Sequence, residues 1–94
     1  MTRDEFAEAA ARDGFEVREV SIEPNQERPP HTHPFDARLF ILAGTFTLVV
    51  GGERRVFRPG EVCALDAHTP HQEVTGADGA RYIAGRRAPA PAVV

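Results

Sequence analysis

The chain has 94 residues, 41% of them hydrophobic, and a formal net charge of −3. This length and apolar content are typical of one small globular domain and exclude a disordered chain. The negative charge argues against a nucleic-acid-binding module, although every basic residue is an arginine and a local basic patch is therefore possible.

Cysteine content and the N-terminal residues bear on the compartment. A lone cysteine, Cys63, excludes an internal disulfide and favours a reducing environment, so we expect a cytoplasmic protein. The polar start Met1–Glu5 is unlike a secretory signal. No segment approaches the ~18 apolar residues of a membrane-spanning helix, so we expect no membrane partner.

The first predicted element is a short helix from Thr2 to Ala11, within an N-terminal segment of residues 1–14. Thr2 and Glu5 have the spacing of a capping box, in which each side chain accepts a hydrogen bond from the other residue's backbone. Phe6 and two alanines form a narrow apolar stripe, so the helix must pack on the domain to persist. Gly14 is predicted to stop it.

Short strands separated by turns follow, and residues 15–86 are predicted to form one domain. The first strand changes phase between Val17 and Val20, which indicates a bulge or an edge strand. Strands are expected at 15–22, 38–43, 45–50, 53–57, 61–65, 71–75 and 81–84, with a hairpin at 51–52, breaks at Gly44 and 76–79, a proline-rich loop at 24–30 and a loose tail at 87–94. This spacing predicts an all-β sandwich or small barrel.

One run is apolar on both faces of its strand. Residues Leu39 to Leu42 carry no polar side chain at either parity, which predicts a strand that is covered on both sides. Because a single small core leaves one of these sides without cover, we expect a homodimer.

Histidines supply the chemistry. Prolines at 29, 30 and 34 favour extended backbone, so the side chains of His31 and His33 point to the same face. Two neutral imidazoles on one face are half of a transition-metal site. His71, which shares a strand face with Glu73, is the predicted third ligand. Three histidines, with or without a carboxylate, suit a divalent Fe, Mn, Ni, Cu or Zn ion.

These residues resemble the cupin superfamily, in its small single-domain form, over about residues 15–85. The first cupin motif, a His-x-His followed by a glutamate and a glycine, is matched by His31, His33 and Gly44. The second, which runs from a glycine to a histidine, is matched by Gly60 and His71. The resemblance implies a jelly-roll β-barrel with a short N-terminal helix and a metal in the barrel. It does not choose a function, because cupins include dioxygenases, isomerases, sugar-binding regulators and storage proteins.

The first motif departs from the cupin pattern at its carboxylate. Ala37 stands where the glutamate is usual, and the adjacent Asp36 has the wrong parity unless a bulge after Pro34 turns it inward. The fourth ligand is therefore Asp36, Glu73 or water. Asp36 and Glu73 are the candidate catalytic residues, because a carboxylate in this place either completes the metal shell or moves protons.

The second motif departs at Asp66, where a proline is usual, and at His68, where a glycine is usual. A histidine at that turn is predicted to need a positive φ, and it can then line the mouth of the site. Cys63 is expected to be a small buried apolar group. Two arginines, Arg38 and Arg81, are expected to form surface ion pairs, or one of them holds an anionic substrate.

Two functions remain open. The first is a metal-dependent enzyme of dioxygenase or isomerase type that acts on a small organic molecule. The second is a non-catalytic ligand-binding or sensory module, which the missing glutamate at Ala37 favours. Such a sensor would act through a partner, because the chain has no room for a DNA-binding helix pair. A structural zinc site is less favoured, since sites of histidine without cysteine more often keep an open position.

Overall fold

The structure is a computed structural model that describes residues 1–90. These residues form one helix and six strands: α1 (Arg3–Arg12), β1 (Glu16–Ile22), β2 (Glu27–His31), β3 (Asp36–Val50), β4 (Glu53–Phe57), β5 (Val62–Leu65) and β6 (His71–Arg87). The predicted all-β fold with a short N-terminal helix is confirmed. Residues 91–94, which belong to the predicted tail, lie outside the described residues.

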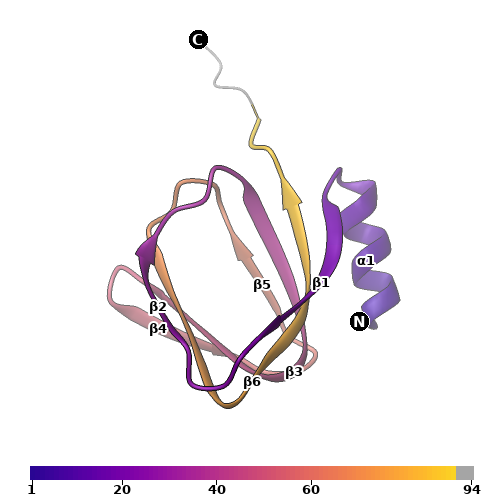
Figure 1. Cartoon of the computed structure of the whole chain (residues 1–94). Coiled ribbons are helices and arrows are strands. Elements are labelled where there is room, and N and C mark those ends of the chain that lie inside the picture. Colours follow the sequence, from indigo (N-terminus) through magenta and orange to yellow (C-terminus); the bar gives the residue numbers. More distant parts are fainter. Residues whose placement is uncertain (91–94) are drawn as a thin grey trace.

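The long strands β3 and β6 organise the sheet. They pair with each other in antiparallel fashion and take part in both halves of a six-stranded sheet. In one half, the start of β3 pairs with β5 and the end of β6 pairs with β1; in the other, the end of β3 pairs with β4 and the start of β6 pairs with β2. The halves curve around a common interior (Figure 1). Over residues 1–90 no ladder joins β4 to β5, so the jelly-roll is not a closed barrel.

The bend between the halves occurs where Gly44 of β3 lies beside Gly79 of β6. Both glycines have a positive φ, 73° and 66°. A Cβ on Gly44 would lie 2.0 Å from the carbonyl oxygen of Gly79, so only glycine permits this approach. The prediction that Gly44 and residues 76–79 end their strands was wrong. Both strands bend and continue, because the β3–β6 pairing resumes beyond the bend with a register shift.

The loop predicted over residues 24–30 was also wrong, because β2 begins inside it. Pro29 and Pro30 lie exposed in β2, which pairs with β6 and has a register shift between Arg28 and His31. Proline is tolerated at a sheet edge, where its missing N–H deprives no neighbouring strand of a hydrogen bond. The extended backbone that the prolines favour is therefore compatible with an edge strand.

The helix α1 lies on the outside of the sheet, beside its edge strand β1 (Figure 1). The predicted capping box at Thr2 and Glu5 is present. β1 is an edge strand with continuous register, so its change of phase is not a bulge. Val20 packs on the interior cluster, whereas Val17 packs on the outer cluster with Phe6. At this length and polarity, α1 is unable to span a membrane.

Two clusters of buried side chains form the core. The interior cluster lies between the halves of the sheet and includes Ile41, Phe46 and Tyr82. The outer cluster joins Phe6 of α1 to Phe40, whose rings stack with centroids 5.5 Å apart. The predicted two-sided burial of the run at 39–42 is confirmed, but the chain's own helix supplies the outer cover. The homodimer stays a prediction.

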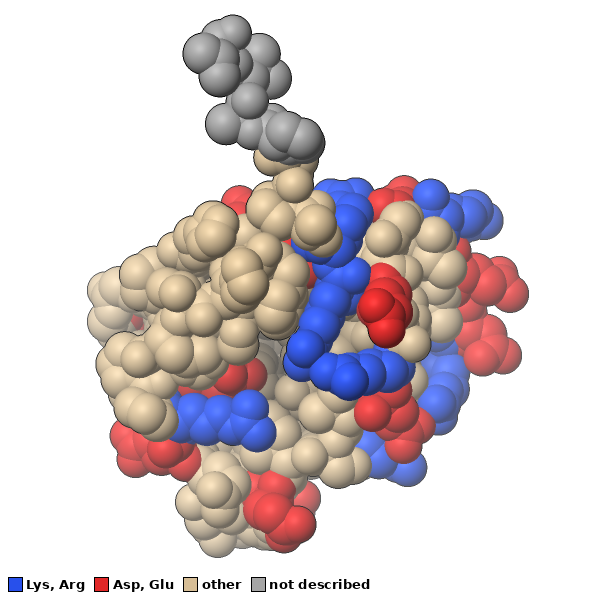
Figure 2. Space-filling model, turned by 45° about the horizontal axis from the view of Figure 1, so that its top comes forward, with Lys and Arg blue, Asp and Glu red and all other residues tan. Residues whose placement is uncertain are grey.

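Charged side chains of both signs are spread over the surface. Figure 2 turns the top of the molecule in Figure 1 forward and shows basic side chains gathered beside a hollow in this face. This face contains the exit of β6 towards the C-terminus and the loops that join β2 to β3 and β5 to β6. The hollow therefore lies at the same end of the molecule as the segment that carries His33.

Candidate metal centre

Four side chains converge at the wall of the interior: His31, His33, His71 and Glu73. One ligand atom from each lies within 4.8 Å of those from the other three. β2 ends at His31 and β6 begins at His71, and these two residues are register partners. Glu73 lies two residues along β6 from His71, on the same face of the strand. The structure therefore brings together the three predicted ligands and one of the two predicted carboxylates.

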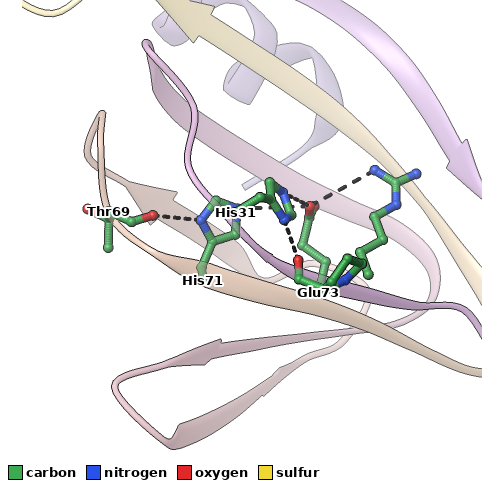
Figure 3. A network of polar contacts seen from close by, with 6 residues as sticks. His31, Thr69, His71 and Glu73 are labelled. Carbon is green, nitrogen blue, oxygen red and sulfur yellow. Dashed lines mark hydrogen bonds and ion pairs between the residues drawn. The ribbon is translucent and has the colours of Figure 1, made fainter.

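Backbone carbonyls fix the orientation of two imidazoles. The Nδ1 atom of His31 lies 2.8 Å from the carbonyl oxygen of Pro29, and Nδ1 of His71 lies 2.8 Å from that of Thr69 (Figure 3). A carbonyl only accepts, so each Nδ1 donates a proton and each neutral ring has its lone pair on Nε2. Metal-binding histidines are commonly held in this way by their second nitrogen.

The lone pairs on Nε2 face the carboxylate of Glu73. Its Oε2 atom lies 2.9 Å from Nε2 of His31 and 3.9 Å from Nε2 of His71 (Figure 3). This oxygen is buried and accepts no hydrogen bond from the described residues; a guanidinium nitrogen of Arg28 lies 4.0 Å away. Electron-pair donors at these distances repel unless a cation or a proton lies between them. The arrangement fits either a bound metal or a protonated His31.

The third imidazole belongs to a crowded group of rings. The ring centroids of His31, His33 and His71 lie 4.4 to 5.0 Å apart. Burial lowers the pKa of His33, and the neighbouring His31 and His71 lower it further. His33 is therefore held in the neutral form that binds metals. Three imidazole nitrogens and a carboxylate oxygen suit a divalent Fe, Mn, Ni, Cu or Zn ion.

Asp36 does not reach this group. Its neighbour Ala37 lines the interior cavity, so Asp36 points to the other face of β3. The Oδ1 atom of Asp36 accepts a hydrogen bond from the backbone N–H of Ala67 (2.9 Å), and Oδ2 lies 3.6 Å from a guanidinium nitrogen of Arg87. Asp36 therefore ties β3 to the loop between β5 and β6, outside the residues that are placed to hold a metal.

The turn at His68 touches the site through its backbone. His68 has the predicted positive φ, 65°. Its backbone N–H donates a hydrogen bond of 2.8 Å to the carbonyl oxygen of His33. Its side chain is exposed and is not one of the four residues that converge. The turn thus holds the backbone of a candidate ligand without supplying one.

Three other candidate residues are not among the four that converge. Cys63 is buried and lines the interior cavity, and burial raises the pKa of its thiol to about 11. Arg38 pairs with Asp13 at 2.6 Å, and Arg81 lies 3.9 Å from Glu19. Both arginines therefore form the expected surface ion pairs.

A cavity of about 50 Å³ is lined by three of the four residues, His33, His71 and Glu73. Its walls include Tyr82 and Arg86 as well as apolar side chains. Burial raises the pKa of Tyr82 to about 12, so its hydroxyl keeps its proton and is able to donate a hydrogen bond. Sequence reasoning missed Arg86. The available signal was its spacing of four residues from Tyr82, which places both on one face if the strand continues beyond Ala84.

Comparison with known proteins identifies the family. The sequence model of a family described as "Cupin domain" matches residues 18–84. The search of curated proteins gave no match. Among solved structures, the polyketide cyclase RemF of Streptomyces resistomycificus is 28% identical, with a TM-score of 0.69 over 87% of this chain and 62% of that one. A cupin 2 conserved barrel domain protein of Salinispora arenicola is 26% identical, with a TM-score of 0.66 over 77% and 61%.

A third structure bears on the fold alone. The DMSP lyase DddQ of Ruegeria pomeroyi is 22% identical, with a TM-score of 0.70 over 84% of this chain and 41% of that one. The present chain thus spans about three fifths of the length of the first two proteins and about two fifths of the third.

Proposed function

Because the chain belongs to the cupin family, we propose that it is a metal-dependent enzyme acting on a small organic molecule in the interior cavity. In this proposal His31, His33, His71 and Glu73 hold the metal. The observation that carries the proposal is the buried Oε2 of Glu73, which faces the lone pairs of two imidazoles and has no hydrogen-bond donor among the described residues.

Glu73 takes the place of the carboxylate that the cupin pattern carries at Ala37. Both residues line the same cavity, Glu73 from β6 and Ala37 from β3. A divalent transition metal, when bound, supplies Lewis acidity and open coordination positions for an oxygen ligand. The small side chain of Ala37 leaves room on the β3 side of the cavity. Apolar side chains line part of the cavity, and a less polar surrounding strengthens polar interactions inside.

The class of reaction remains part of the proposal. RemF, which is 28% identical, is a polyketide cyclase, and this supports an organic substrate for the present chain. Dioxygenase- or isomerase-type chemistry is the prediction that follows from the cupin resemblance. Glu73 is the residue expected to hold or move a proton, because among residues 1–90 it is the one carboxylate on the cavity wall. A cytoplasmic location is proposed from the unpaired thiol of Cys63.

A second function keeps the metal but has no turnover. The absence of a carboxylate at Ala37 favours a ligand-binding or sensory module, since the usual cupin ligand set is altered there. Oxygen consumption with catechols, flavonols and diketones, combined with mass spectrometry of the products, separates the two functions. Turnover of any of these compounds supports the enzyme. Binding without conversion, across the whole panel, supports the module.

The metal site itself is tested by metal analysis of untagged protein. We expect about one divalent ion per chain, because the four residues form a single metal site. A combined His31→Ala, His33→Ala and His71→Ala variant is expected to lose the ion. His68→Ala is the matched control, since its side chain is exposed and is not one of the four residues. Unchanged metal content in the triple variant would refute the assignment.

A further inference from the structure

Arg86, which is exposed, is the one arginine on the wall of the cavity within the described part of the chain. Two other arginines of the same strand have carboxylate partners: Arg81 lies 3.9 Å from Glu19, and Arg87 lies 3.6 Å from Asp36. No carboxylate of residues 1–90 lies within ion-pairing distance of Arg86. Its positive charge is therefore available to a ligand.

An aromatic ring holds the guanidinium in place. The group lies 4.7 Å from the ring centroid of Phe35, and this ring stacks on His33 with centroids 4.8 Å apart. Stacking on an aromatic face orients a guanidinium and leaves its N–H groups free along the edge. These N–H groups are suited to a planar carboxylate, which accepts two parallel hydrogen bonds. Arg86 thus presents an anion-binding group one ring away from a proposed metal ligand.

The cavity is small, and part of its wall is apolar. This apolar part includes Leu39, Phe46, Leu48 and Leu65. A cavity of about 50 Å³ has room for roughly four water molecules. The enclosed part of a ligand therefore has only a few non-hydrogen atoms. The hydroxyl of Tyr82, which makes no hydrogen bond within residues 1–90, is a second donor for the ligand.

We infer that the cavity binds a short-chain carboxylate, with its acid group paired to Arg86 and its hydrocarbon part against the leucines. This inference rests on the proposed function, because three residues of the metal centre, His33, His71 and Glu73, line the same cavity. Arg86 is the residue that selects an anionic ligand. The surface arginines Arg38 and Arg81 do not serve this purpose, since both already pair with carboxylates.

Zinc-loaded protein, butyrate and its neutral analogue butyramide provide the test. Isothermal titration is expected to show that the wild type binds butyrate at least about tenfold more tightly than butyramide, as a charge-assisted pair predicts. Arg86→Gln is expected to abolish this preference, because it weakens butyrate binding more than butyramide binding. Arg81→Gln is the matched control, because Arg81 is exposed like Arg86 and lies on the same strand, but is not on the cavity wall.

The outcomes separate this inference from the proposed function. Butyrate affinity that is equal in the wild type and Arg86→Gln overturns the inference, as does a wild type that binds no butyrate or shows no preference over butyramide. Zinc content and circular dichroism are measured for every variant, so that loss of metal or of fold is recognised. A folded wild type that holds none of zinc, iron, manganese, nickel and copper when each is offered refutes the proposed function instead.

Discussion

The Nε2 atom of His31 lies 2.9 Å from Oε2 of Glu73, while the proton on Nδ1 of the same ring is directed at the carbonyl oxygen of Pro29. In the neutral ring, two acceptors therefore face each other at hydrogen-bond distance. Glu73 comes from β6, whereas the cupin pattern places its carboxylate on β3 at Ala37. The cavity thus has a carboxylate that comes from a different strand and from the opposite half of the sheet.

Glu73→Gln tests the role of this carboxylate. The substitution keeps the shape of the side chain and removes its charge, so we expect zinc affinity to fall by about tenfold or more. Adding Ala37→Glu to this variant is expected to restore part of the affinity, because both positions line the cavity. Competition with a chromophoric chelator measures the affinities. Glu53→Gln, on the exposed surface of β4, is the control. Equal affinity in Glu73→Gln and the wild type would contradict the assignment.

Asp36 is predicted to position the metal centre from outside it. Asp36 accepts a hydrogen bond from Ala67, and the next residue, His68, donates one to the carbonyl of His33. Loss of the acceptor in Asp36→Ala is expected to weaken zinc binding by about tenfold. Asp36→Asn keeps an acceptor oxygen and is expected to retain most of the affinity.

The same chelator competition distinguishes positioning from ligation by Asp36. If Asp36→Asn loses as much zinc affinity as Asp36→Ala while both remain folded, the carboxylate charge matters and the hydrogen bond to Ala67 does not explain the effect. Asp66→Ala, in the exposed part of the same loop, is expected to bind zinc as the wild type does.

Cys63 is predicted to react with iodoacetamide only at high pH. Burial disfavours the thiolate and raises the pKa of Cys63 to about 11, so at pH 8 only about one chain in a thousand carries the thiolate. The alkylation rate should rise about tenfold per pH unit well beyond pH 9, where an ordinary thiol with a pKa of about 8.5 is already levelling off. Alkylation of urea-unfolded protein is the reference. A plateau near pH 9 in the folded protein would be the contrary result.

Gly44→Ala is expected to destabilise the fold by more than about 3 kcal/mol, because it adds steric overlap to the cost of a positive φ. Its Cβ would lie 2.0 Å from the carbonyl oxygen of Gly79, so β3 and β6 must separate at the bend. Gly52→Ala also has a positive φ, but its Cβ meets nothing within 4 Å, and about 1 kcal/mol is expected there. Urea unfolding measures both. If the two variants lose similar amounts of unfolding free energy, the close approach of Gly44 to Gly79 does not account for the effect of Gly44→Ala.

The homodimer is tested by light scattering at micromolar concentration. The expected mass is twice the chain mass of 10.3 kDa. Because α1 already covers residues 39–42, the dimer is now expected for two other reasons. The core is small, and Val56 of β4 and Val62 of β5 are each 44% exposed. A mass of one chain would contradict the homodimer. The packing of α1 would then be the only cover that residues 39–42 need on the outer face of the sheet.

The fold and most of the site were predictable because local rules govern them. Prolines force extended backbone around His31 and His33, and strand alternation places His71 and Glu73 on one face. The parity of Asp36 already opposed its role as a ligand, and the structure places it with Ala67 and Arg87.

The errors arise where pairing with a distant strand overrides local composition. Pro29 and Pro30 indicated a loop, but β6 supplies a partner and their position at an edge removes the penalty. Gly44 indicated a break, but the paired backbones of β3 and β6 continue through it. The continuation of β6 beyond Ala84 also carries Arg86 to the cavity, which no local pattern required.

X-ray absorption at the zinc edge of zinc-loaded protein tests the metal centre most directly, because it counts the ligands around the ion. The proposed site predicts the scattering of three imidazole rings at about 2.0–2.1 Å together with an oxygen ligand, and Glu73→Gln should alter the oxygen contribution while leaving three imidazoles. A spectrum with fewer than three imidazoles, or one that Glu73→Gln leaves unchanged, would contradict a centre built from His31, His33, His71 and Glu73.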